Sequence, residues 1–176
     1  NSSTGVTVST SGRLVLTRCL FYDGSGSSSD HIRLGALTAD LTVDGCTIDN
    51  AGRHGINLQG NAAEVLIQNC LITNNGASGT GYGISTTATN PPAVLRNCAY
   101  YANATGETTG LDSGRVTGSI SLSGDPYNDR SSDDYRLHPS AAGAAQCKGT
   151  GYPASLNSFS TSRNIGAFDT VAASAS

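Results

Sequence analysis

Apolar and polar residues alternate in short runs along the first two thirds of the chain. In Leu41-Thr-Val-Asp-Gly-Cys46-Thr-Ile48 the apolar side chains fall on alternate positions until a glycine interrupts the run. Alternation with a period of two is typical of a β-strand that buries one face. Good helix formers are scarce, with glutamate only at Glu64 and Glu107. The pattern therefore predicts an all-β chain of short strands and tight turns.

A repeat emerges when the cysteines are superposed. Cys19, Cys46, Cys70 and Cys98 lie 27, 24 and 28 residues apart, and each follows a short alternating strand and a turn. Repeats of this length are typical of solenoids, in which each coil buries its inner face on the next. Three ladders are expected along the axis: the four cysteines, a turn column of Arg18, Gly45, Asn69 and Asn97, and an apolar column of Leu16, Val43, Ile67 and Leu95.

Each repeat also carries a later, glycine-led strand. We expect these strands at His31–Leu34, Gly55–Leu58 and Gly83–Ser85, with Gly110–Asp112 as the fourth. The rungs Asn50-Ala-Gly-Arg-His-Gly-Ile-Asn-Leu58 and Asn75-Gly-Ala-Ser-Gly-Thr-Gly-Tyr-Gly-Ile84 resemble those of the right-handed parallel β-helix repeat family. This family includes pectate-lyase-like enzymes, bacterial surface proteins and phage tailspikes. The resemblance implies a single-stranded right-handed parallel β-helix of about four to five rungs.

The repeat dissolves near Ser119, so residues 1–118 are predicted to form the rungs. Residues 119–171 are predicted to be an irregular C-terminal cap of the same domain, folded over the last rung, and residues 172–176 a tail. The segments 124–130, 134–140 and 164–169 are similar to the closing segment of many family members. Within the cap we expect a strand from Tyr135 to His138 and a last strand from Asn164 to Phe168. A cap would protect unpaired strand edges from aggregation.

Composition excludes several functional classes. Charged residues make up 13% of the chain and the formal net charge is −3, which is not the basic balance of a nucleic-acid binder. No apolar run is long enough for a membrane span. The chain starts at Asn1 and contains no Met, so we expect it to be processed or part of a longer protein.

The cysteines are expected to pack in the core and not to form a redox or metal site. There are five, including Cys147 outside the ladder, and none belongs to a C-x-x-C or lies near a histidine. We expect an inward ladder of protonated thiols, and neither a metal site nor a cofactor. Unoxidised thiols favour assembly in a reducing compartment.

No residue set reads as catalytic. The candidate glycan-facing residues are Asp44, Gln68 and Arg96, which share a column before the turn, the adjacent pair Arg53 and His54, and Tyr101. Two further hypotheses are a carboxylate pair, Asp44 with Asp49, suited to glycoside hydrolysis, and a calcium site among the terminal acidic residues. The terminal candidates are ordinary turn residues and lack an EF-hand order: Asp125, Asn128, Asp129, Asp133 and Asp134.

Three functions are considered, and a non-enzyme is favoured. The first is a structural or adhesion module of a larger assembly, with a phage virion spike, fibre or capsid decoration protein as the leading expectation. Its expected partners are other subunits, with a homotrimer as one arrangement, and a cell-surface glycan; its expected location is the virion, assembled in the host cytoplasm. The alternatives are a polysaccharide lyase or glycoside hydrolase of the pectate-lyase-like fold, and a secreted bacterial surface protein, extracellular or at the cell surface.

Overall fold

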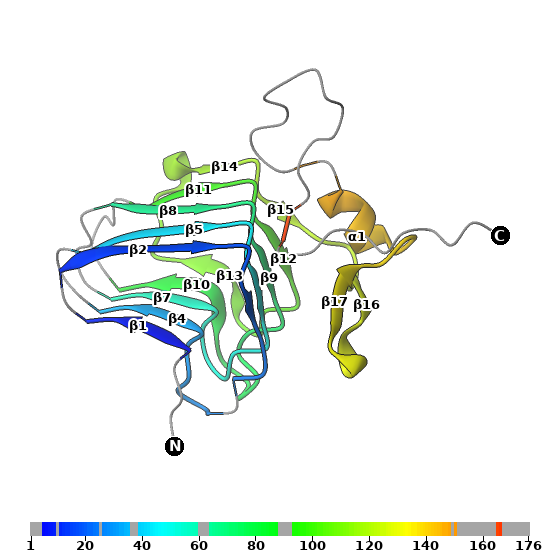
Figure 1. The fold of residues 1–176 in the computed structure, drawn as a ribbon, viewed down its shortest axis with the longest axis horizontal. Coiled ribbons are helices and arrows are strands. Elements are labelled where there is room, and N and C mark those ends of the chain that lie inside the picture. The colour runs from blue at the N-terminus through cyan, green and yellow to red at the C-terminus, as the bar shows by residue number, and fades with distance from the viewer. Residues whose placement is uncertain are drawn as a thin grey trace.

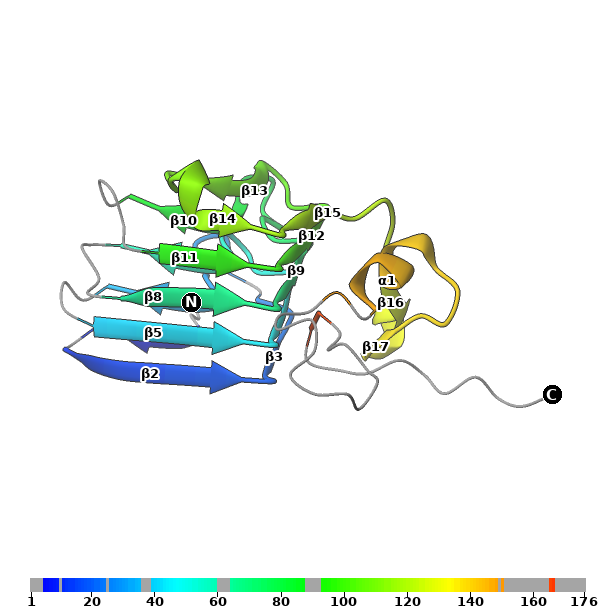
Figure 2. The same cartoon turned by 90° about the horizontal axis from the view of Figure 1, so that it is seen from above.

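The chain winds into a parallel β-helix whose wall consists of three sheets (Figure 1). The computed structural model describes residues 5–9, 11–24, 26–35, 39–59, 64–87, 93–148, 150 and 165–166. Each sheet contains five of the described strands, and each strand pairs in parallel with its counterpart one repeat away. A rung is one strand from each sheet, and the rungs stack along one axis (Figure 2). The predicted all-β solenoid is confirmed.

The strands follow one another in the order sheet A, sheet B, sheet C. Sheet A contains β1 (Val6–Val8), β4 (Ile32–Leu34), β7 (Ile56–Leu58), β10 (Tyr82–Thr86) and β13 (Gly106–Thr109). Sheet B contains β2 (Gly12–Thr17), β5 (Ala39–Asp44), β8 (Val65–Gln68), β11 (Ala93–Arg96) and β14 (Val116–Thr117). Sheet C contains β3 (Leu20–Phe21), β6 (Thr47–Asp49), β9 (Leu71–Thr73), β12 (Ala99–Tyr101) and β15 (Ile120–Ser121).

The core is a set of apolar columns that run from rung to rung. The predicted column is confirmed, because Leu16 pairs with Val43, Val43 with Ile67, and Ile67 with Leu95. The three later members are fully buried. Alternation explains this burial, since every second side chain of a strand points into the coil.

The predicted turn column between sheets B and C is also confirmed. Its members have φ angles between 50° and 64°, the left-handed region: Arg18, Gly45, Asn69, Asn97 and Gly118. Asparagine and glycine tolerate this conformation best, which accounts for their recurrence before the cysteine. The same backbone shape in every rung lets the turns stack, and the Asn69 Nδ2 donates to Asp44 Oδ1 of the preceding rung at 2.8 Å.

Stacked asparagines line a second corner, between sheets C and A. The side chain of Asn75 is buried; its Oδ1 accepts from the Ala51 N–H at 3.0 Å, and its Nδ2 donates to Asn103 Oδ1 at 2.9 Å. Asn103 in turn donates to the Ile72 carbonyl at 3.0 Å. These amides satisfy backbone groups that the corner would otherwise bury without partners.

The terminal segment packs beside the coil. It contains a hairpin of β16 (Tyr127–Asp129) and β17 (Asp134–Leu137), the short helix α1 (Ala142–Cys147) and the 3₁₀ turn Arg130–Ser132. A second apolar cluster joins Tyr127, Leu137 and Cys147 to Leu71 and Ala99, which point outward from sheet C. The segment therefore covers the outer face of sheet C (Figure 1). From the sequence we expected it to lie over the last rung.

The sequence misplaced the last part of the coil. The last glycine-led strand was expected at Gly110–Asp112, but β13, the fifth strand of sheet A, is Gly106–Thr109. Gly110 has φ +71°, and a Cβ there would approach the Thr86 carbonyl oxygen to 2.5 Å, so this glycine belongs to a turn. The last rung strand, β15, reaches Ser121 and extends past the expected boundary at residue 118. The expected strand Asn164–Phe168 lies largely outside the described residues.

Candidate polysaccharide-facing surface

Three candidate residues form one outward column on sheet B. Asp44 pairs with Gln68 and Gln68 with Arg96, as their spacing predicted. A neighbouring outward column is more apolar, with Val15, Thr42, Leu66 and Val94 in register. Each strand thus presents a polar position near its carboxyl end and a neutral one two residues earlier.

A groove of about 540 Å³ crosses this face. The apolar column supplies Thr42, Leu66 and Val94 as its floor, and charged residues surround them: Arg13, Asp40, Glu64, Arg96 and Arg115. Asp40 and Glu64 stand on adjacent rungs, because each precedes a residue of the pair Leu41 and Val65. Among the described residues, no salt bridge within 4.0 Å involves Arg13, Asp40 or Glu64. Arg96 alone of the predicted residues lines this groove.

Arg53 and His54 lie elsewhere, at the entry to sheet A. Arg53 forms a salt bridge with the fully buried carboxylate of Asp30 at 2.6 Å. His54 Nδ1 accepts from the Tyr82 N–H at 3.0 Å, and the two rings stack with centroids 6.0 Å apart. Burial lowers the pKa of His54. Both side chains hold neighbouring rungs together.

Tyr101 occupies a third location, at the last rungs of sheet C. It packs against the terminal apolar cluster and lines a hollow of about 230 Å³ with Asn103 and Glu107. Ser121 Oγ donates to the Glu107 carboxylate across this hollow. The six candidate residues are therefore distributed over three separate places on the coil.

The hypothetical pair of Asp44 and Asp49 is wrong. Asp44 belongs to sheet B, whereas Asp49 belongs to sheet C and has no exposed side-chain surface beneath the terminal segment. Asp49 accepts hydrogen bonds from Thr73 at 2.6 Å, Tyr135 at 3.3 Å and Arg130 at 3.4 Å. This junction between coil and terminal segment was not predicted, because residues 49 and 130 are far apart in sequence.

The terminal acidic residues bind neighbouring side chains. Asp134 accepts from Arg136 Nη2 and from Asn128 Nδ2, both at 2.7 Å, and Arg136 lowers the pKa of its carboxyl. Asp129 accepts from Ser131 and Ser132. Among the described residues, no group of His, Cys, Asp or Glu has the arrangement of a metal site.

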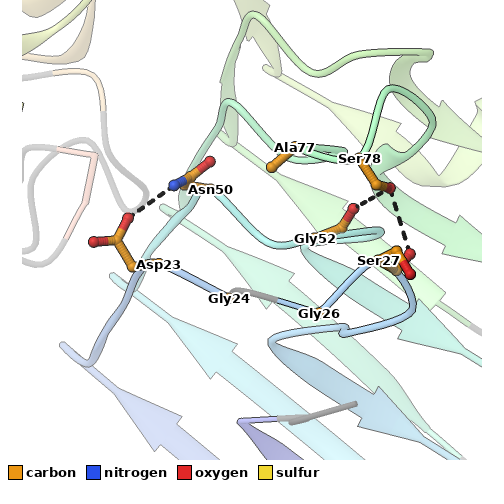
Figure 3. Close-up of a pocket in the computed structure, with 8 residues that line it drawn as sticks. All are labelled: Asp23, Gly24, Gly26, Ser27, Asn50, Gly52, Ala77 and Ser78. Carbon is orange, nitrogen blue, oxygen red and sulfur yellow. Dashed lines mark hydrogen bonds between the residues drawn. The ribbon is translucent and has the colours of Figure 1, made fainter. Parts of the chain in front are cut away.

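A second groove, of about 480 Å³, lies on the loops that connect sheet C to sheet A (Figure 3). Asn50 Nδ2 donates to Asp23 Oδ1 at 2.8 Å on one side. Ser78 Oγ donates to the Gly52 carbonyl at 2.7 Å on the other. Glycines dominate the floor, and a Cβ on Gly52 would meet the Gly26 carbonyl oxygen at 1.8 Å. This groove was not predicted from the sequence.

Cys19, Cys46, Cys70 and Cys98 form the predicted ladder, and these thiols and that of Cys147 are all free. Cys70 Sγ donates to the Gln68 carbonyl at 3.2 Å, and burial raises its pKa well above the ordinary value. Burial also raises the pKa of Cys147 to about 12. Such thiols are protonated and poorly reactive. Cys19, in the first rung, is the member that is only partly buried.

The three parallel sheets, the stacked turns and the internal ladders define this protein as a right-handed parallel β-solenoid. The chain belongs to the right-handed β-helix family, whose model, described as "Right handed beta helix region", matches residues 1–122. The match ends one residue after β15. Comparison with curated proteins and with solved structures finds no significant match. Among the described residues, no helix is long and apolar enough to cross a membrane.

Proposed function

We propose that this chain is a structural and adhesion module of a larger assembly, and that it contacts glycans through the groove on sheet B. A phage virion spike, fibre or decoration protein is the assembly we favour. The free thiols support folding in a reducing compartment, such as a host cytoplasm. The β-helix supports the module role, because stacked rungs form a stiff and elongated scaffold.

The observation that carries the glycan proposal is the chemistry of the groove. Arginine and carboxylate side chains bind hydroxyl and carboxylate groups with directional hydrogen bonds. The aliphatic floor of Leu66 and Val94 offers apolar contact for the C–H faces of a sugar ring. The groove crosses neighbouring rungs, so an extended chain of sugars fits it better than a compact ligand does. Arg115 pairs with Asp112 at 4.0 Å, so the arginines of the groove and their neighbouring carboxylates balance, and both acidic and neutral oligosaccharides are candidate ligands.

The test is calorimetric titration with a panel of acidic and neutral oligosaccharides. Arg13→Ala and Glu64→Gln are expected to weaken binding of the best ligand by about tenfold each, the effect of losing about 1.4 kcal/mol. Arg136→Ala, on the exposed terminal hairpin, is the matched control and should leave binding unchanged. No binding across the panel, or binding that both groove variants retain, would overturn the proposal.

A polysaccharide-cleaving enzyme is the second candidate, and the pair of Asp40 and Glu64 favours it. Neighbouring rungs stand about 4.8 Å apart, near the separation of about 5–5.5 Å between the two carboxyl groups of retaining glycosidases. The panel should therefore also be assayed for new reducing ends and for unsaturated products, with and without calcium. Turnover that Asp40→Asn and Glu64→Gln each abolish would establish this candidate; intact substrates would exclude it for that panel.

A secreted bacterial surface protein is the third candidate. Its discriminating observation is the thiol state of the protein isolated from its source. Disulfides there would favour export, and five free thiols would favour the virion proposal.

A further inference from the structure

The charges of the sheet B groove are separated along the coil axis. Asp40 and Glu64 stand side by side in one outward column, on β5 and immediately before β8. Two arginines line the same groove nearer the carboxyl-terminal rungs, Arg96 on β11 and Arg115 just ahead of β14 (Figure 2). The groove therefore has a negative part and a positive part.

The negative part opposes two like charges. Carboxylates directly opposite one another on neighbouring strands destabilise a sheet. Arg13 occupies the next position of this column, in register with Asp40, but no salt bridge within 4.0 Å involves Asp40 or Glu64 in the part of the chain that the structure describes. Local conflicts of this kind are expected at functional sites. A cationic group of a ligand would relieve the repulsion.

The positive part adjoins the end of the apolar floor. Arg96 lies two positions beyond Val94 on the same face of β11, and Arg115 begins the next rung. Arg115 pairs with Asp112, but the two side chains are 43% and 50% exposed, so solvent screens their attraction. A guanidinium group binds a carboxylate with two parallel hydrogen bonds. This end of the groove is therefore suited to a carboxylate of a ligand.

The separation of the two parts selects an extended ligand. Glu64 and Arg115 are two rungs apart, which is about 10 Å along the coil axis. Leu66 and Val94 lie between them and supply the aliphatic floor. A free amino acid carries its ammonium and carboxylate groups on one carbon atom and cannot reach both parts. An oligosaccharide reaches both when the two groups stand on different sugars.

We propose that the ligand of this groove is a zwitterionic glycan, with a free amino group bound by Asp40 and Glu64 and a carboxylate bound by Arg96 and Arg115. The inference rests on the proposed glycan-binding function and narrows its ligand class. A protonated amine donates three hydrogen bonds, enough to reach both carboxylates. N-acetylation removes the charge and leaves one donor, so the groove should distinguish an amino sugar from its acetylated form.

The test uses three oligosaccharides that share one glucosamine backbone. A carboxymethylated chitosan oligosaccharide carries both charges. Its N-acetylated derivative keeps only the carboxylate, and the plain chitosan oligosaccharide keeps only the amine. Calorimetric titration at pH 6 keeps the amine protonated. The doubly charged probe is expected to bind at least tenfold more tightly than either singly charged probe.

Two variants assign the charges of the ligand to the two parts of the groove. Glu64→Gln should weaken binding of the two amine-bearing probes at least tenfold and change binding of the N-acetylated probe less than twofold. Arg115→Gln should weaken the two carboxylate-bearing probes at least fivefold and change the plain chitosan probe less than twofold. Both residues are exposed, so the fold should tolerate the changes. Arg136→Ala is the control and should leave all three affinities unchanged.

Several outcomes would overturn the zwitterionic ligand. These are equal affinity for the carboxymethylated probe and its N-acetylated derivative, a Glu64→Gln variant that weakens all three probes alike, or tighter binding of a peptide with one lysine and one glutamate. Binding of a neutral or acidic oligosaccharide of the first panel, with no binding of the doubly charged probe, would overturn this inference alone and leave the glycan groove standing. No binding in either set would overturn both proposals.

Discussion

Arg53 holds the carboxylate of Asp30 with two parallel hydrogen bonds, from Nε to Oδ1 at 2.9 Å and from Nη2 to Oδ2 at 2.6 Å. Asn57 Nδ2 adds a third at 2.7 Å, and the His54 N–H a fourth at 3.2 Å. Burial raises the pKa of Asp30, but the hydrogen bonds from Arg53 and Asn57 outweigh it, so the pKa lies below its ordinary value. The Asp30 carboxylate is therefore ionised, and the guanidinium of Arg53 balances its charge.

Replacing Arg53 by alanine should destabilise the fold, because it leaves a buried carboxylate without its cation. Breaking a buried pair costs about 3–5 kcal/mol, and the 31% exposure of Arg53 reduces the expected loss to about 2–3 kcal/mol. Urea denaturation at pH 7 measures it. Arg136→Ala breaks an exposed pair with Asp134 and should cost far less, because solvent screens both charges. Equal losses in the two variants would contradict this account of Asp30.

Stability should fall as the pH drops from 7 toward 5, because of His31. This residue is buried, its Nε2–H donates to the Asp49 carbonyl at 2.7 Å, and burial lowers its pKa below 6.5. Below pH 6.5 the unfolded chain binds a proton that the folded chain does not, so the stabilising contribution is complete above 6.5 and decreases below it. The slope is at most about 1.4 kcal/mol per pH unit for each such histidine.

The measurement is urea denaturation at pH 5, 6, 7 and 8, for the wild type and for His31→Gln. The variant should show a shallower slope between pH 7 and 5, whatever its stability at pH 8. His54 has the same sign, since burial also lowers its pKa, so part of the slope should persist. Identical slopes for both proteins would show that His31 does not titrate on unfolding.

Alkylation should distinguish Cys19 from the other cysteines. Cys46, Cys70, Cys98 and Cys147 have no exposed surface, whereas Cys19 is partly buried. With iodoacetamide at pH 8, mass spectrometry is expected to find Cys19 modified first and the other four protected. In denaturing urea all five should react. Modification of Cys70 as fast as Cys19 in the folded protein would contradict the buried ladder.

Asp49→Asn should loosen the terminal hairpin and leave the coil intact. The substitution keeps the shape but removes the charge that Arg130 and Tyr135 contact. Hydrogen–deuterium exchange should speed by about tenfold in β16 and β17, the effect of losing about 1–2 kcal/mol, with no change in β8 and β11 of sheet B. Asp129→Asn lies in the same segment and serves as the control, because the Asp129 carboxylate accepts its hydrogen bonds from Ser131 and Ser132 and not from the coil.

The sequence was most informative where one rung repeats another. The columns of Leu16 and of Cys19 could be predicted from the spacing of the repeats, because stacking places equivalent positions of successive rungs side by side. The column of Asp44, Gln68 and Arg96 was found in the same way. The strand β13 was not predicted, because its residues Gly106–Thr109 are polar. The later pair Gly110-Leu111 matched the glycine-led pattern of the other repeats.

Contacts outside the repeat could not be predicted from the spacing of the cysteines. Asp40 and Glu64 face one groove, but neither belongs to the part of the repeat that the cysteines align. The position of the terminal hairpin depends on outward apolar residues of sheet C, such as Leu71 and Ala99, which alternation alone assigns to solvent. Leu71 and Ala99 are buried because Tyr127 and Leu137 of the terminal hairpin pack against them.

The contact between Arg130 and Asp49 has a mechanical consequence. Successive rungs are joined by hydrogen bonds along the coil axis, so a force applied to the carboxyl end would detach strands one after another, as a zipper opens. Arg130 reaches back 81 residues to the second rung and closes that stretch of chain into a loop. Tension from residues beyond 130 therefore reaches Asp49 before it reaches β15, and the contact must break before the last rungs can unravel.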